Sequence, residues 1–245
     1  MSELGILLPL IFFAALLFSS VGHGGASAYL AVFALIDMAP ENMRPAALCL
    51  NVLVASIALY KFYKVNAFDW HLFLPVAITS IPFAFIGGQV NLPNQTYKIL
   101  VGLCLVYAAW TIFYRANKID DVTVRPVAKT VLLGLGAGLG FLSGLTGIGG
   151  GIFLSPILLF FSWAKTKVIS GVAAAFILVN SISGLLGVLL KSPTLPAGLV
   201  FWATAAILGG WIGAEFGSKR LENPTIRKLL AVVLVFAGSK MMLSA

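Results

Sequence analysis

The chain has 245 residues, 60% of them hydrophobic and only 10% charged, and its mean hydropathy is +1.03. Soluble domains carry about 25% charged residues, so this composition excludes a soluble protein and predicts one membrane domain over residues 1–245. The net charge of +8 does not indicate binding to nucleic acid. The basic residues lie in short loops between apolar runs, where they determine membrane topology.

Ten apolar segments follow one another along the chain, separated by polar stretches or by glycine and proline. A helix that crosses a hydrocarbon core of about 30 Å needs about 20 apolar residues, at about 1.5 Å per residue. Segments 25–36 and 150–163 are too short for this. They either pass through as short helices or belong to re-entrant hairpins that enter the membrane and return. The ten segments are residues 4–20, 25–36, 45–60, 72–90, 97–114, 130–146, 150–163, 168–190, 197–217 and 226–243.

The two halves of the chain match at a nearly constant offset, with the same order of long and short segments. Such self-similarity indicates an internal repeat. We therefore predict an all-α polytopic membrane protein with two repeats, 1–114 and 129–245, of about five helical segments each, joined by a cytoplasmic loop 115–128. The matches are Gly22-His23-Gly24-Gly25 with Gly147-Ile148-Gly149-Gly150 and Ser56 with Ser181, both 125 residues apart, and Gly87 with Gly213, 126 apart.

Positive charges gather on one side of the membrane when every segment counts as a pass. The loops on that side hold twelve of the 16 basic residues. Cytoplasmic loops carry the excess of Lys and Arg, so this side is predicted to be cytoplasmic and both termini to lie outside. Each half then makes an odd number of crossings, which inverts the second repeat. The outer four are Arg44, Lys98, Lys191 and Lys240; the cytoplasmic twelve are Lys61, Lys64, Arg115, Lys118, Arg125, Lys129, Lys165, Lys167, Lys219, Arg220, Arg227 and Lys228.

A glycine-rich break precedes each short segment. Glycine lets the backbone turn sharply, and each break ends at a helix N-terminus with free N–H groups and a positive dipole end. Inverted repeats bring two such ends together near the midplane, where they form an anion cradle without any buried Lys or Arg. The alternative is that the glycines only allow close helix packing. The predicted binding residues of the breaks are Gly22, His23, Gly24, Gly25, Ser27, Gly147, Gly149, Gly150 and Gly151.

Polar side chains in the segments after the two short ones extend this candidate site. They are Asn51 and Ser56 in 45–60, and Asn180 and Ser181 in 168–190. Inside a membrane such groups must find a partner or face water. They either donate hydrogen bonds to the anion or join neighbouring helices to each other.

Two ionisable residues are candidates for proton coupling. His23 lies inside the first break, where an imidazole can donate to an anion or carry a proton; the second repeat has Ile148 at this position, which favours a packing role instead. Glu215 lies within an apolar segment, but Lys219 follows four residues later, the spacing of a helical ion pair.

Three stretches of the sequence carry a family resemblance. They are Val21-Gly22-His23-Gly24-Gly25-Ala26-Ser27, Met43-Arg44-Pro45-Ala46-Ala47-Leu48 with Asn51, and Gly144-Leu145-Thr146-Gly147-Ile148-Gly149-Gly150-Gly151. In them, and over nearly the whole chain, the sequence resembles the TauE/SafE family of sulfite and sulfonate exporter-type membrane permeases. The resemblance implies transport of small sulfur-containing anions, such as sulfite or organosulfonates, without an ATPase.

A secondary transporter of the cytoplasmic membrane, working by alternating access, is therefore the predicted function. Its partners would be a small anionic substrate and the lipid bilayer, with association into a homo-oligomer left open. We predict no catalytic residue, no cofactor and no metal site, because the apolar segments lack a nucleophile with a base or a set of metal ligands. An anion channel, or a membrane partner protein that transports nothing, is the alternative.

Overall fold

The structure of the chain is a computed structural model, and every regular element in its described residues is an α-helix, which confirms the all-α fold. The helices are α1 (Ser2–Ser19), α2 (Ala26–Leu35), α3 (Pro40–Lys64), α4 (Trp70–Gln89), α5 (Asn94–Arg115), α6 (Lys129–Thr146), α7 (Gly151–Phe160), α8 (Thr166–Lys191), α9 (Leu199–Lys219) and α10 (Pro224–Leu243). The residues outside the description are 1, 116–123, 192–193, 220–223 and 244–245. They include Lys118, Arg220 and most of the predicted loop 115–128.

The lengths of the helices confirm a multi-pass membrane protein. Within the described residues, α3, α4, α6, α8 and α9 are long and apolar enough to cross a membrane. By contrast, α2 and α7 have ten residues each, about 15 Å at the usual rise of about 1.5 Å per residue. They coincide with the predicted segments 25–36 and 150–163, and both are short, as expected.

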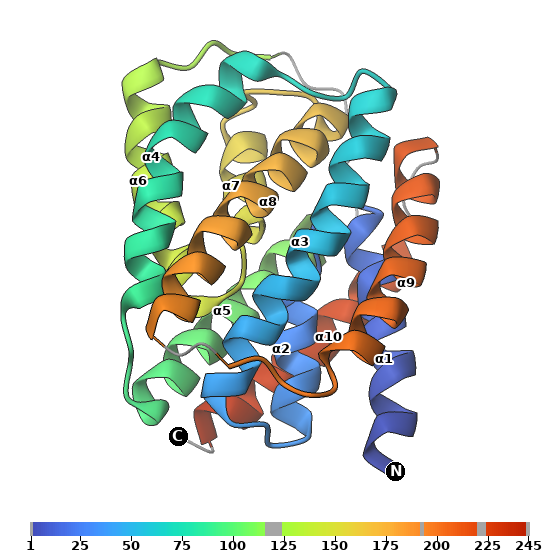
Figure 1. Cartoon of the computed structure of the whole chain (residues 1–245). Helices are drawn as coiled ribbons and strands as arrows, with labels where there is room; N and C mark the ends of the chain where they lie inside the picture. The colour runs from blue at the N-terminus through green and yellow to red at the C-terminus, as the bar shows by residue number, and fades with distance from the viewer. Residues whose placement is uncertain (1, 116–123, 192–193, 220–223, 244–245) are drawn as a thin grey trace.

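The short helices belong to two hairpins, α1–α2 and α6–α7. Figure 1 shows that α1 starts and α2 ends at the lower end of the molecule, whereas α6 starts and α7 ends at the upper end. Each pair enters the molecule and returns to the end from which it came. Each pair thus forms a hairpin within the molecule, and the tips of the two hairpins are the glycine-rich breaks.

Long helices surround these tips in corresponding pairs. α3 and α8 pack against each other at the centre of the molecule (Figure 1), between a flank of α4 and α6 and an opposite flank of α1 and α9. α5 packs along α10. In each flank the first helix of a hairpin thus lies against one long helix.

Glycines at four-residue spacing form the contact surface of both flanks. Small residues at this spacing let two membrane helices approach closely, and a β-carbon at any of them would collide with a backbone carbonyl of the facing helix. On α6, Gly136, Gly140 and Gly144 face Val76, Ser80 and Ala84; on α9, Gly209, Gly213 and Gly217 face Phe12, Leu16 and Ser20. These six glycines therefore have a packing role.

The start of α3 differs from the prediction. The helix begins at Pro40, not at residue 45, with proline in its first turn followed by Glu41. Proline is favoured there because the missing N–H would have no partner, and an acidic side chain suits the positive dipole end. Arg44 consequently lies inside the helix and is only 7% exposed. Counting it as a loop cation in the topology argument was wrong.

Candidate functional site

The first break, residues 20–25, separates α1 from α2. Gly25 precedes α2 with a φ of +96°, a left-handed conformation that glycine adopts without steric cost. No side chain of the break caps the new helix. Instead Asn51 of α3 accepts a hydrogen bond from the backbone N–H of Ala26 through its Oδ1, at 2.9 Å. The N-terminus of α2 is therefore fixed by the neighbouring long helix.

The second break separates α6 from α7 in the same way. Gly147 ends α6 and Gly150 precedes α7, with φ values of +81° and +75°, and Gly149 between them has a φ of +83°. Hydrogen bonds made by two side chains fix the backbone where α6 ends and this break begins. Tyr97 Oη donates to the carbonyl of Thr146 at 2.9 Å, and Thr146 Oγ1 accepts from the N–H of Ile148 at 3.3 Å.

Asn51 connects the two breaks. Its Oδ1 binds the start of α2, and its Nδ2 donates to the carbonyl of Ile148 and to Ser181 Oγ, both at 3.3 Å. Its side chain has no solvent exposure. Ile177 of α8 lies against both breaks as well, since β-carbons at Gly24 and Gly149 would each lie 3.0 Å from its Cγ2. The tips of the two hairpins therefore meet in the protein interior, between α3 and α8.

Most of the predicted binding residues lie in the two breaks or next to them, and some of them contact Asn51 or Ile177. Gly22 packs on the backbone of Ser170, and a β-carbon at Gly151 would collide with Ile177. Ser27 is buried in the first turn of α2. The predicted residues that contact Asn51 or Ile177 are Gly24, Gly149, Gly151 and Ser181, and those that lie elsewhere in the breaks or in the first turn of α2 are Gly22, His23, Gly25, Ser27, Gly147 and Gly150.

Ser56 is not brought to the breaks. It is exposed, and its hydroxyl donates to the carbonyl of Val52 in its own helix, at 2.6 Å. It lines a surface groove with aromatic residues such as Tyr60 and Trp70. The buried face of α3 carries Ala55 instead, and Ser56 points away from that face.

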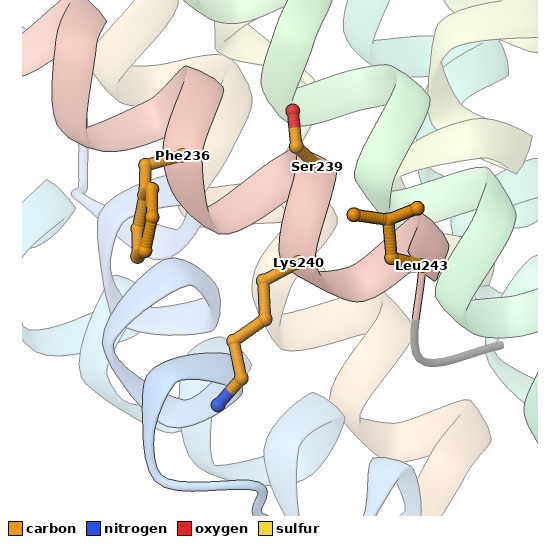
Figure 2. Close-up of a pocket in the computed structure, with 4 residues that line it drawn as sticks. All are labelled: Phe236, Ser239, Lys240 and Leu243. Atoms are coloured by element: carbon orange, nitrogen blue, oxygen red, sulfur yellow. The ribbon is translucent and has the colours of Figure 1, made fainter.

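A second surface groove lies on α10, also away from the breaks. Figure 2 shows its lining residues Phe236, Ser239, Lys240 and Leu243. Lys240 Nζ reaches the carbonyl of Leu35 at 2.9 Å and Asp37 Oδ2 at 3.0 Å. A cation at the negative end of α2 stabilises the helix, so this lysine ties α10 to the first hairpin.

Asn180 is completely buried, and neither its Oδ1 nor its Nδ2 has a hydrogen-bond partner among the described residues. It lies three residues after Ile177 and four before Gly184, which faces Gly144. Residues at these spacings share one face of a helix. Asn180 is therefore on the side of α8 that faces the second hairpin.

His23 connects the first break to the second hairpin. Its Nδ1 lies 3.1 Å from the carbonyl of Val21, and its Nε2 lies 3.3 Å from Ser155 Oγ of α7. A carbonyl can only accept, so Nδ1 carries a proton, whereas the serine hydroxyl can either donate to Nε2 of the neutral ring or accept from Nε2 of the protonated ring. The imidazole therefore joins the first break to α7 through both of its ring nitrogens.

Arg44 is a cation next to the second break that the sequence analysis did not select. It is directed at carbonyls near the C-terminal ends of two helices, where the dipole is negative. Nε and Nη2 both donate to the carbonyl of Gly144, at 2.9 and 2.5 Å. Nη2 also donates to the carbonyl of Gly87 at 2.6 Å, and Nη1 donates to the carbonyl of Val90 at 2.9 Å. A β-carbon at Gly147 would lie 3.0 Å from Arg44 Cγ. A buried cation therefore lies beside the second break, and its guanidinium is bonded to these carbonyls.

Glu215 makes ion pairs with Lys61 of α3 and with Lys219 one turn along α9. The predicted helical pair with Lys219 is confirmed. Lys61 Nζ also lies 4.1 Å from the centre of the Trp211 ring, a favourable cation–π distance. These contacts join α3 to α9 and favour the structural role over proton coupling.

Comparison with known proteins identifies the class to which this arrangement belongs. The family model "Sulfite exporter TauE/SafE" matches residues 7–241. The "Probable membrane transporter protein y4hK" of Sinorhizobium fredii is 37% identical over 235 residues, which cover 94% of this chain and 95% of that protein. The "Probable membrane transporter protein MJ0441" of Methanocaldococcus jannaschii is 26% identical, with 76% of this chain and 73% of that protein covered. No solved structure matches the chain.

Proposed function

The chain belongs to the sulfite exporter TauE/SafE family and is a multi-pass membrane transporter, not an enzyme. On this premise we propose that it is a secondary transporter of small anions, sulfite or organosulfonates, and works by alternating access in the cytoplasmic membrane. The observation that carries the proposal is the meeting of the two hairpin tips at Asn51.

The chemistry of the hairpin tips suits an anion. Each tip is the start of a helix, with N–H groups that lack an intrahelical partner and a positive dipole end. Two such ends converge on the same few side chains, and the end of α2 is enclosed by protein, since Ala26–Ala34 are all buried. Half-helices of this kind bind anionic groups in other transporter folds. We therefore propose the residues of the two breaks as the substrate site.

Alternating access is supported by the way in which the two halves are arranged. The hairpins enter from opposite ends of the molecule (Figure 1), and the flank of α4 and α6 corresponds to that of α1 and α9. This is the arrangement expected of inverted repeats over residues 1–114 and 129–245. Rocking of one repeat against the other would open the central site to each side in turn.

Topology gives the first test. We predict that cysteines introduced at Lys64 and Lys165 react with a membrane-impermeant thiol reagent only from the cytoplasmic side, because the basic loops lie there. A cysteine at Glu41 should react only from outside. The measurement is labelling of intact cells against inverted vesicles, in a background without Cys49 and Cys104. Labelling of Glu41→Cys from the cytoplasm would refute the proposed orientation.

Transport by the purified full chain in proteoliposomes tests the function itself. We expect saturable uptake of sulfite or of a small organosulfonate, and counterflow against unlabelled anion on the opposite side. A channel would instead give uncoupled, unsaturated flux, and no uptake of any of these anions would refute the anion proposal.

A pH gradient across the same vesicles tests His23 as the proton-coupling residue. His23→Gln keeps a side chain that can hydrogen-bond but cannot take up a proton. It is expected to leave anion binding largely intact and to abolish acceleration of uptake by the gradient. Acceleration equal to that of the wild type would remove His23 from the coupling mechanism, and Glu215→Gln is the parallel variant for the second candidate.

A further inference from the structure

Two buried hydroxyl groups without partners lie at the two breaks, one at each. Tyr29 and Ser143 have no solvent exposure, and neither hydroxyl has a hydrogen-bond partner among the described residues. Buried polar groups are nearly always hydrogen-bonded, because an unmade bond destabilises the folded protein. An exception next to a proposed binding site therefore points to a ligand that makes the missing bond.

Tyr29 is directed at the first break by the geometry of its own helix. Side chains of an α-helix lean toward its N-terminus, and Tyr29 lies one turn after Gly25. A β-carbon at Gly25 would lie 2.8 Å from both Oη and Cζ of the tyrosine. The absence of a side chain at Gly25 is what leaves room for the phenol. Its hydroxyl therefore lies beside the glycine from which α2 starts.

Ser143 occupies the corresponding place at the second break. It lies in the last turn of α6, and a β-carbon at Gly150 would lie 3.2 Å from its Cβ. Gly25 and Gly150 immediately precede α2 and α7, respectively, and both have a left-handed backbone conformation. Tyr29 lies on the second helix of its hairpin, whereas Ser143 lies on the first helix of the other hairpin. The two residues are also of different types, so an alignment of the two halves of the sequence does not pair them.

We propose that Tyr29 Oη and Ser143 Oγ donate hydrogen bonds to the transported anion, one from each break. The ligand class that fits is an oxyanion with at least two acceptor oxygens. Each break supplies one hydroxyl group and the free N–H groups of a helix N-terminus, so the anion can accept hydrogen bonds from both breaks. This inference rests on the proposed function and adds to it the two side chains that select an oxyanion.

The test is the affinity of the purified full chain for sodium sulfite and for methanesulfonate, measured by titration calorimetry. Tyr29→Phe and Ser143→Ala each remove little besides one hydroxyl. Each is expected to weaken binding about tenfold or more, the usual effect of losing a hydrogen bond to a charged group. The thermal unfolding temperature without ligand should not fall, because a hydroxyl without a protein partner stabilises nothing in that state.

Ser183→Ala is the matched control. Ser183 is also buried on α8, but its hydroxyl already donates to the carbonyl of Ile81, at 2.5 Å. We expect this variant to have a lower unfolding temperature and unchanged affinity. Unchanged affinity in Tyr29→Phe and Ser143→Ala would overturn the inference, and so would a fall in their unfolding temperatures equal to that of the control. If the wild type binds neither anion, the proposed function itself fails, and this inference with it.

Discussion

Replacement of Asn51 by aspartate is expected to abolish anion binding while the protein still folds. The carboxylate has nearly the shape of the amide and can still accept from the N–H of Ala26. It cannot donate to the carbonyl of Ile148, and it adds a negative charge where the two hairpin tips meet. The positive ends of the helix dipoles favour the ionised form of the aspartate. Its carboxylate therefore occupies the position that the transported anion would take beside the two helix N-termini.

The expected effect is large. Two like charges about 5 Å apart repel by about 3 kcal/mol at an effective dielectric constant of about 20, which lowers affinity by more than about a hundredfold. The measurement is sulfite binding by monodisperse protein. Asn94→Asp, the same exchange at an exposed position at the start of α5, should bind like the wild type.

A neutral variant separates charge from lost hydrogen bonds. Asn51→Ala loses all three hydrogen bonds of the amide but adds no charge, so it should keep more affinity than Asn51→Asp. Wild-type affinity in Asn51→Asp would show that the anion does not bind between the breaks. Equal losses in the two variants would show that the charge is not the cause.

Replacement of Arg44 by methionine is expected to cause the largest loss of stability. The guanidinium donates to three carbonyls from α4 and α6 and from the residue after α4. Methionine fills much of the same volume but cannot donate. A buried carbonyl left without a donor destabilises the protein by about 1–3 kcal/mol, so we expect a total of at least about 3 kcal/mol.

The measurement is the thermal unfolding temperature in detergent, together with the yield of monodisperse protein. Arg44→Lys should lie between the wild type and Arg44→Met, because an ammonium group cannot reproduce the planar fork of a guanidinium. Lys64→Met, which removes an exposed cation at the other end of α3, is the control and should have little effect. An Arg44→Met protein as stable as the wild type would contradict the role assigned to these hydrogen bonds.

The class of protein, the helices and the breaks could be predicted from the sequence alone. These properties depend on features that are local in the chain. Apolar length decides whether a segment can cross a bilayer, which is why segments 25–36 and 150–163 were correctly recognised as short. Glycine runs mark sharp turns, and the spacing of Glu215 and Lys219 is enough to pair them on one helix.

Which polar side chains lie beside the breaks could be seen only in the folded structure. Ser56 and Asn51 are five residues apart on one helix, and nothing local shows that Asn51 faces the breaks while Ser56 faces away. A constant offset paired Ser56 with Ser181, whereas Ser181 binds Asn51, 130 residues away.

Arg44 illustrates why the surroundings of a polar side chain could not be predicted from the sequence. A cation is stable inside a membrane protein only where acceptors surround it, and its acceptors here are Gly87, Val90 and Gly144, 43, 46 and 100 residues further along the chain. The hydroxyl groups of Tyr29 and Ser143 are distinguished in the same way, by what surrounds them after folding. Such surroundings exist only once α3, α4, α6 and α8 have packed together.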